Sequence, residues 1–145
     1  MQVREIMTTP AQVVDPSCSL TDLAEKMRND DLGAVPICDG DKMLGMVTDR
    51  DIVTRAVTMD RPLSQCKASD VMSKDVAYVH DDDDIDQAEK LMSSKQVRRL
   101  PVVSRDNRLV GMVTVADLAR KANRNTDWAL EGITQPTGAK QSRKM

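Results

Sequence analysis

The sequence predicts a mixed α/β protein of the α+β kind, built from two copies of one β-α-β-β-α unit. The phrase GMVTDRD at Gly45–Asp51 recurs as GMVTVAD at Gly111–Asp117, and each phrase joins an apolar strand-like run to a helix-like one. A spacing of 65 residues relates further pairs, including Met7 and Met72, Val14 and Val79, Met27 and Met92, and Pro36 and Pro101. The spacing then rises to 66, which places one inserted residue in a turn between two strands. A duplication of this length predicts two small halves that pack together.

The first copy follows the predicted order of elements from residue 4 onward. Residues 4–7 read as a helical turn and residues 13–14 as a brief strand. Ser19 can cap a helix whose apolar face carries Leu20, Leu23 and Met27. Residues 34–38 and 43–48 alternate as two strands around a turn, and a second helix begins at residue 49. This second helix is predicted to point Ile52, Val53 and Ala56 inward.

The second copy repeats the pattern with strands at 76–79, 100–103 and 109–114 and helices at 85–92 and 115–121. Residues 60–68, which include Pro62, read as a linker. The predicted domains are therefore 7–63 and 72–128. Residues 129–145 end in a basic segment without apolar periodicity and are predicted to form a mobile tail.

Composition excludes several classes of protein. The net charge of -2 gives no broad basic field for nucleic acid. No run approaches the roughly 18 apolar residues that span a bilayer, and the amino terminus lacks a signal-peptide core, so we expect a soluble cytoplasmic protein that does not engage a membrane. The three cysteines, Cys18, Cys38 and Cys66, are widely spaced and are expected to be free thiols.

Both copies carry a set of short motifs in the same order. The first has Ile6-Met7-Thr8, Val35-Pro36 and the Gly45–Asp51 phrase; the second has Val71-Met72-Ser73, Leu100-Pro101 and the Gly111–Asp117 phrase. This doubled pattern resembles the CBS domain, and most closely the short stand-alone CBS pairs, including the bacterial hypoxic-response type. The resemblance implies two repeats packed about a pseudo-twofold axis with two clefts between them. It also implies association into dimers and binding of adenosine-containing ligands.

The residues supply chemistry that suits such a ligand. The carboxylates of Asp51 and Asp117 can accept hydrogen bonds from the 2′ and 3′ hydroxyls of a ribose. The hydroxyls of Thr48 and Thr114 can donate to a phosphate at a helix amino terminus. Close backbone approach is expected at Gly45 and Gly111, and the base is expected to lie beside Val14, Ala34 and Val35. The remaining candidate ligand-binding positions of the motifs are Thr8, Pro36, Ser73, Arg99, Leu100 and Pro101.

Two of these assignments have structural alternatives. Thr-x-x-Asp at the start of a helix is also a form of capping box, in which side chains and backbone bond reciprocally. Arg99, with Arg98 or Lys95, could neutralise a di- or triphosphate or could be a solvated cation at a strand entrance. Because the first copy has Gly33-Ala34 at the position of Arg98-Arg99, the two clefts are expected to differ.

The chain carries no motif that predicts catalysis. The acidic run Asp81–Asp84 with Asp86 could hold a cation, but carboxylates before a helix more often complement the helix dipole, so no metal site is predicted. His80 is the single histidine, and the sequence lacks a GxSxG elbow, a P-loop and HExxH. We therefore expect neither an enzyme nor a catalytic cofactor.

The sequence thus predicts a regulatory, ligand-sensing module that signals through the geometry of a homodimer to an unidentified downstream protein. Its ligand is expected to be AMP, ADP or ATP, with S-adenosylmethionine and NAD as alternatives. Two other functions remain open. The protein could be a ligand-free dimerising scaffold that responds to redox state through its cysteines. Less favoured is nucleic-acid binding through the basic tail, with Arg120, Lys121 and Arg124 nearby.

Overall fold

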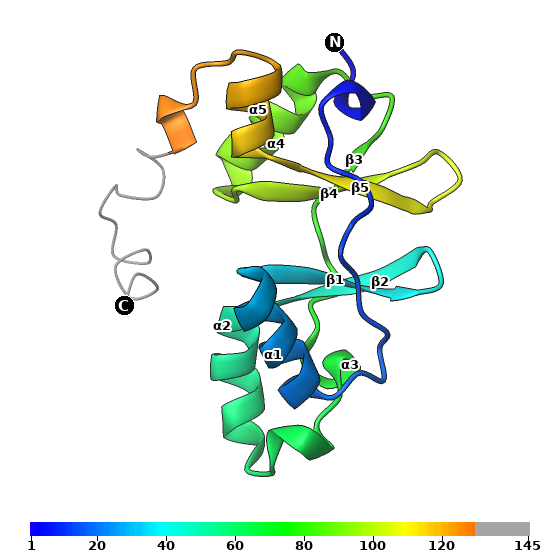
Figure 1. Ribbon diagram of the computed structural model, residues 1–145, viewed down its shortest axis with the longest axis vertical. Helices are drawn as coiled ribbons and strands as arrows, with labels where there is room; N and C mark the ends of the chain where they lie inside the picture. Colours follow the sequence, from blue (N-terminus) through cyan, green and yellow to red (C-terminus); the bar gives the residue numbers. More distant parts are fainter. Residues whose placement is uncertain (130–145) are drawn as a thin grey trace. The chain divides into compact units, whose positions relative to one another are not determined.

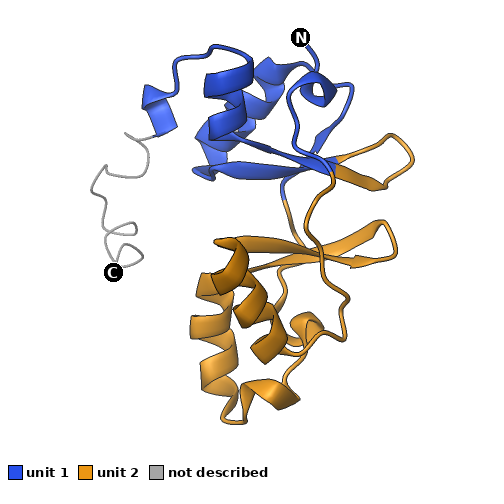
Figure 2. Cartoon of the chain, in the orientation of Figure 1, with its two compact units in different colours: residues 1–9, 77–102, 111–145 blue, residues 10–76, 103–110 orange. Residues whose placement is uncertain are grey.

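The protein divides into two compact units, which the computed structural model describes over residues 1–129 (Figures 1 and 2). Unit 1 consists of residues 1–9, 77–102 and 111–129, and unit 2 consists of residues 10–76 and 103–110. The predicted tail lies outside the described residues apart from Ala129. Within each unit, helices lie on one face of a small sheet, and this arrangement confirms the predicted mixed α/β fold (Figure 1).

The first helix of unit 2 is α1, Leu20–Asp30, and the residues that flank it determine where it starts and ends. The Ser19 hydroxyl accepts a 3.1 Å hydrogen bond from the Asp22 N–H, and Asp31 ends the helix in the left-handed region at φ 55°. Leu20, Leu23 and Met27 are buried on one face, as their spacing predicts. Strands β1, Ala34–Asp39, and β2, Lys42–Thr48, then pair antiparallel. The predicted first strand is reduced to one parallel bridge between Val14 and Ile37.

The second helical segment of unit 2 is irregular. It starts as α2, Asp49–Asp51, continues as a π-helical turn over Ile52–Ala56, and ends as a 3-10 turn over Val57–Met59. Ile52 and Ala56 are buried as predicted. The inward placement of Val53 was wrong, because the side chain is 64% exposed. In the π-helical turn Ile52 and Ala56, four residues apart, take the core positions, so Val53 projects to solvent.

The second half of the predicted linker at residues 60–68 has regular structure and contributes to a core. Residues Leu63–Gln65 form a 3-10 turn, and helix α3 spans Ala68–Val71. Cys66 and Ala68 are fully buried in the core of unit 2, and their backbone groups bond to Leu20 and Cys18. Because this segment completes a core, it belongs to the fold of unit 2.

Unit 1 contains a three-stranded sheet in the order β3-β4-β5. The strands are β3 Val79–His80, β4 Arg99–Val103 and β5 Leu109–Thr114, and the helices are α4 Ile85–Lys95 and α5 Val115–Lys121. The Asp84 side chain caps α4 through the Asp86 N–H at 2.9 Å, and Gln96 ends it at φ 56°. The inserted residue falls in a turn closed by the Ser104 N–H bonding to the Arg108 carbonyl, as predicted.

The segment after α5 contacts α4 mainly through one acidic side chain of that helix. The Glu89 carboxylate accepts hydrogen bonds from the Trp128 indole N–H at 2.9 Å and from Arg124 at 3.0 Å. Arg124 also pairs with Asp86 at 2.7 Å. Two acidic residues of α4 therefore bind two residues of the following segment and fix residues 124–128 against α4.

The opening segments of the two copies are exchanged between the units. A 3-10 turn at Val3–Glu5 leads into Thr8, which bonds to Met112 on β5 in both directions, at 2.7 and 3.0 Å. Ser73 bonds in the same way to Met46 on β2, at 2.9 and 3.0 Å. Each copy's opening segment therefore lies beside the last strand of the other copy, and the compact units differ from the sequence repeats in this respect.

Candidate functional site

Two equivalent sets of residues gather where each opening segment meets a strand and its following helix. We call them the Asp51 set, in unit 2, and the Asp117 set, in unit 1. The Asp51 set consists of Gly45, Thr48, Asp51, Arg55 and Ser73. The Asp117 set consists of Gly111, Thr114, Asp117, Lys121 and Thr8. Each set lies within a single unit.

The glycines permit the opening segments to approach. A Cβ atom at Gly45 would lie 2.6 Å from the Ser73 carbonyl oxygen, and one at Gly111 would lie 2.8 Å from the Thr8 carbonyl oxygen. Both distances are below any tolerable contact, and both neighbours are backbone atoms. The close approach expected at these glycines is therefore made by the protein's own backbone, which sets the positions of Ser73 and Thr8.

Each Thr-x-x-Asp motif forms a capping box. In unit 2 the Thr48 N–H donates to Asp51 Oδ2 at 2.9 Å, and the Asp51 N–H donates to the Thr48 hydroxyl at 3.0 Å. In unit 1 the same two bonds join Thr114 and Asp117, at 3.0 and 3.1 Å. The structural alternative raised by the sequence is thus present in both copies. It fixes the carboxylates while using one acceptor position of each.

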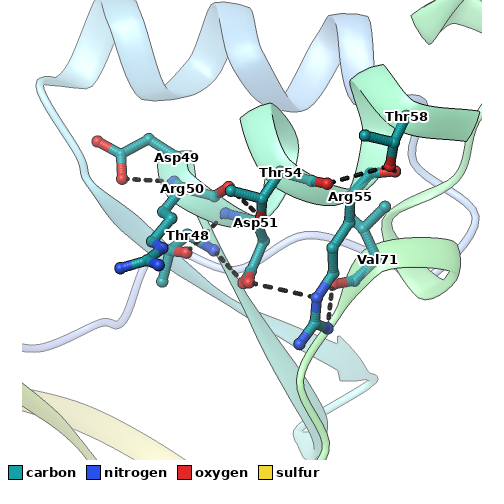
Figure 3. A network of polar contacts seen from close by, with 8 residues as sticks. All are labelled: Thr48, Asp49, Arg50, Asp51, Thr54, Arg55, Thr58 and Val71. Carbon is teal, nitrogen blue, oxygen red and sulfur yellow. Dashed lines mark hydrogen bonds and ion pairs between the residues drawn. The ribbon is translucent and has the colours of Figure 1, made fainter. Parts of the chain in front are cut away.

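A cation one helical turn after each aspartate was missed by the sequence interpretation. Arg55 Nη1 donates to the Val71 carbonyl at 3.1 Å, and its Nε lies 3.9 Å from Asp51 Oδ1 (Figure 3). Lys121 donates to the Ile6 carbonyl at 3.1 Å and lies 3.3 Å from Asp117 Oδ1. Each cation thereby connects an aspartate to an opening segment. The available signal was the 66-residue spacing, which aligns Arg55 with Lys121.

The remaining polar residues of the unit 2 motif serve the helix itself. Figure 3 shows Thr54 donating to the Arg50 carbonyl at 2.8 Å and Thr58 donating to the Thr54 carbonyl at 3.0 Å. The Asp49 carboxylate accepts from the Arg50 N–H at 2.8 Å. The Arg50 side chain is exposed, and this cation has no counterpart in the second copy, where Ala116 stands.

The apolar candidates differ in their exposure. Val14 and Ala34 are half-buried. The other four, Val35, Pro36, Leu100 and Pro101, are buried. Val14 and Ala34 are therefore the members of this group with surface available to a base.

The basic candidates stand at the entrance of β4. Arg98 is exposed and Arg99 is half-buried, while the Arg98 carbonyl accepts a 3.0 Å bond from the Val115 N–H at the start of α5. Within residues 1–129 the Arg99 guanidinium makes no ion pair with a carboxylate. The backbone beside Arg99 contacts the amino terminus of α5, and unit 2 has no arginine at the aligned position, Ala34.

The acidic run before α4 is occupied by structural contacts. Asp84 caps the helix and pairs with the Met1 ammonium at 3.4 Å, Asp81 pairs with Arg4 at 3.7 Å, and Asp83 accepts from the His80 N–H at 2.8 Å. Among the described residues, no three His, Cys, Asp or Glu side chains are arranged to hold a metal ion.

The thiols lie in environments that disfavour the thiolate. Burial, with a smaller effect of Asp41, raises the pKa of Cys38 to about 11. Burial and nearby Asp22 and Asp15 raise the pKa of Cys18 above its ordinary value. Cys66 is buried in the core of unit 2.

No helix within residues 1–129 has the length and apolar character needed to cross a membrane.

The CBS domain family matches residues 3–58 and 68–124, so the chain belongs to the CBS domain family and carries two of these domains in tandem. Hypoxic response protein 1 of Mycobacterium tuberculosis is 40% identical over 118 residues, which are 81% of this chain and 82% of that protein. The uncharacterized protein YlbB of Bacillus subtilis is 33% identical over 138 residues, 92% of each chain.

Solved structures share the fold over most of the chain. The crystal structure of Hypoxic Response Protein I, which has two coordinated zinc ions, has a TM-score of 0.75 at 38% identity and covers 83% of this chain and 98% of that one. CBSX2 in complex with AMP has a TM-score of 0.72 at 26% identity, with 84% and 96% covered. The CBS domain pair of MJ0100, in complex with 5-methylthioadenosine and S-adenosyl-L-methionine, has a TM-score of 0.70 at 25% identity, with 84% and 99% covered.

Proposed function

We propose that this protein is a regulatory module that binds an adenine nucleotide or a related adenosyl compound at the Asp51 and Asp117 sets. Asp51 and Asp117 accept hydrogen bonds from the ribose hydroxyls. The hydroxyls of Thr48 and Thr114 donate to a phosphate, and Arg99 adds a positive charge on the unit 1 side. Val14 and Ala34 offer apolar contact to the base in unit 2.

The observation that carries the proposal is the fixed carboxylate in each copy. A capping box holds each aspartate in one rotamer, so the acceptor positions that the box does not use point in a fixed direction for a diol. The relatives support the ligand class, since the solved CBSX2 holds AMP and the solved MJ0100 pair holds S-adenosyl-L-methionine. AMP, ADP, ATP, S-adenosylmethionine and NAD all contain the adenosine group that these residues would recognise.

We propose that ligand binding acts by changing the geometry of a dimer. Ligand binding changes the population of dimer arrangements only if the ligand favours one of them. We propose that this cytoplasmic homodimer passes the signal to a downstream protein and performs no catalysis itself. Zinc, which the solved Hypoxic Response Protein I coordinates, is not part of the proposal.

Isothermal titration calorimetry with AMP, ADP, ATP, S-adenosylmethionine, NAD and GMP tests the function. We expect one or two sites for an adenosyl compound and no heat from GMP. Asp51→Ala and Asp117→Ala should each remove one site, while circular dichroism shows an intact fold. Unchanged affinity at both sites in the two variants would sink the ribose assignment.

The ligand-free scaffold is the main competing function. A flat response to every nucleotide, together with a dimer mass that depends on reductant, would favour it. The raised pKa of Cys18 and Cys38 weighs against this alternative, because thiolates are the species that oxidise. Nucleic-acid binding through the basic tail falls outside the described residues. Absence of salt-dependent oligonucleotide binding would exclude it.

A further inference from the structure

The two aspartates differ in how many of their acceptor positions are already filled. An ionised carboxylate offers about four positions for hydrogen bonds, and a ribose diol needs two of them. The capping box takes one position at Oδ2 of each aspartate. The two sets differ in whether groups of the protein occupy the remaining acceptor positions.

At Asp117 the remaining positions are occupied by groups of the protein itself. The Thr8 hydroxyl donates to Oδ1 at 3.3 Å and to Oδ2 at 3.4 Å, so it lies across both oxygens. The Lys121 ammonium lies 3.3 Å from Oδ1. Together with the Thr114 N–H, these three donors leave the carboxylate fewer than the two open positions that a diol needs, and its side chain is 9% exposed.

At Asp51 the carboxylate is more open. Ser73, which aligns with Thr8, makes no hydrogen bond to Asp51 in the part of the chain that the structure describes. The Arg55 Nε lies 3.9 Å from Oδ1, beyond hydrogen-bond distance, while Nη1 of the same side chain is held by the Val71 carbonyl. The Asp51 side chain is 14% exposed. Two hydroxyls can therefore bind here without displacing a donor.

We propose that Thr8 is a specificity-determining residue that competes with the ligand for Asp117, so that the Asp51 set fills first. This inference rests on the proposed function and adds to it the order in which the two sets bind the ligand. The Thr8 hydroxyl is chemically the same donor as a ribose hydroxyl, and it spans the two oxygens that the diol would use. A ligand at Asp117 must displace it, and the exposed Thr8 then bonds to water.

The test removes the Thr8 hydroxyl from a protein in which only the Asp117 set can bind ligand. The protein with Asp51→Ala retains the Asp117 set, and Thr8→Val is then added to it, since valine keeps the shape of threonine without its donor. We expect AMP to bind about fivefold more tightly after Thr8→Val, equivalent to about 1 kcal/mol. Thr8→Ser, which restores a hydroxyl, should return the affinity toward that of the Asp51→Ala protein. The gain should shrink for 2′-deoxy-AMP, because that ligand lacks one of the two competing hydroxyls.

Thr9→Val in the same background is the matched control, since it removes an exposed hydroxyl one residue away. We expect its AMP affinity to stay within twofold. If Thr8→Val weakens AMP binding, Thr8 is a ligand contact and the inference is wrong; an unchanged affinity overturns it equally. If the unmodified protein and Thr8→Val bind neither AMP, ATP nor S-adenosylmethionine, the proposed function itself has failed.

Discussion

The ammonium group of Lys121 lies 3.3 Å from the carboxylate of Asp117, one helical turn away on α5. Lys121 also donates to the Ile6 carbonyl, which joins α5 to a segment 115 residues earlier in the chain. Arg55 makes the equivalent connection from Asp51 to the Val71 carbonyl. A cation of this kind holds an acidic side chain and a distant backbone in one arrangement.

Replacement of Lys121 by methionine should lower the free energy of unfolding by about 1 kcal/mol, because it leaves a nearly buried carboxylate and a carbonyl without their shared donor. The effect stays this small because the lysine side chain is 46% exposed and its charge is screened by water. Urea unfolding followed by circular dichroism measures the loss.

Lys121→Arg is the control for that experiment, since it keeps a cation of sufficient reach, and it should recover most of the lost stability. Arg55→Met provides a second comparison. Its effect should be smaller, because Arg55 lies farther from its aspartate, at 3.9 Å. Equal stability of Lys121→Met and the unmodified protein would show that the ion pair contributes nothing.

Alanine at Gly45 or Gly111 should destabilise the protein by about 1–3 kcal/mol, the range for forced repacking of a filled site. The added Cβ atoms would lie 2.6 and 2.8 Å from backbone carbonyl oxygens, which cannot rotate away. Thermal unfolding of the two single variants measures this effect.

Gly33→Ala is the matched control for the glycine variants. Its Cβ would meet Asp49 Oδ2 at 3.7 Å, an ordinary contact, so its melting temperature should stay close to that of the unmodified protein. A similar loss of stability in all three variants would show that helix and strand propensity, rather than contact with the opening segments, sets the cost.

Replacement of Glu89 by alanine should release Trp128 from α4. The carboxylate accepts from the indole N–H and from Arg124, so its removal frees both groups. Trp128 is the single tryptophan of the chain and therefore reports the change directly. We expect a red-shifted emission maximum and stronger quenching by acrylamide.

Asp86→Ala removes the other carboxylate that pairs with Arg124 and leaves the Trp128 bond in place. Its fluorescence should therefore resemble that of the unmodified protein. A red shift in Asp86→Ala as large as that in Glu89→Ala would assign the anchoring to Arg124 alone.

Alkaline conditions should weaken the fold through Cys38. Its pKa is raised from 9.0 in the unfolded chain to about 11 by burial, so the folded state holds this proton more tightly. The resulting contribution to stability is full below pH 9 and is lost as the pH rises toward about 11. Urea unfolding of the unmodified protein and of Cys38→Ala across this interval should show a steeper decline for the unmodified protein. An equal decline in the free energy of unfolding of the two proteins over this pH interval would contradict the raised pKa of Cys38.

Local pattern was sufficient to predict helices α1, α4 and α5 and the strand pairs β1–β2 and β4–β5, whereas the strand predicted at 76–79 shares only Val79 with β3. Leu20, Leu23 and Met27 recur at helical spacing after a serine cap, and the same spacing recurs in α4, so both helices could be placed from the sequence. The inserted turn at 104–108 and the doubled capping boxes followed from the repeat spacing. These features depend on neighbours within a few residues.

The features that sequence did not predict depend on distant partners. Hydrophobic pattern identifies an opening segment but does not say which copy's last strand it pairs with, so the exchange of Thr8 and Ser73 was not foreseen. Val53 was misplaced because helical spacing assumes regular α-helical hydrogen bonding, whereas this segment has a π-helical turn. The contact between Thr8 and Asp117 joins residues 109 positions apart, so no local pattern could predict it.

The exchange of opening segments also sets an order in which the chain can fold during synthesis on the ribosome. Residues 10–76 form almost all of unit 2 and emerge before α4 and α5 exist. Val3 and Ile6, by contrast, are fully buried in unit 1 and must wait exposed until the later segments appear. These residues are thus made before the rest of unit 1 but enclosed only with it, and the nascent chain exposes their apolar side chains until the later segments emerge.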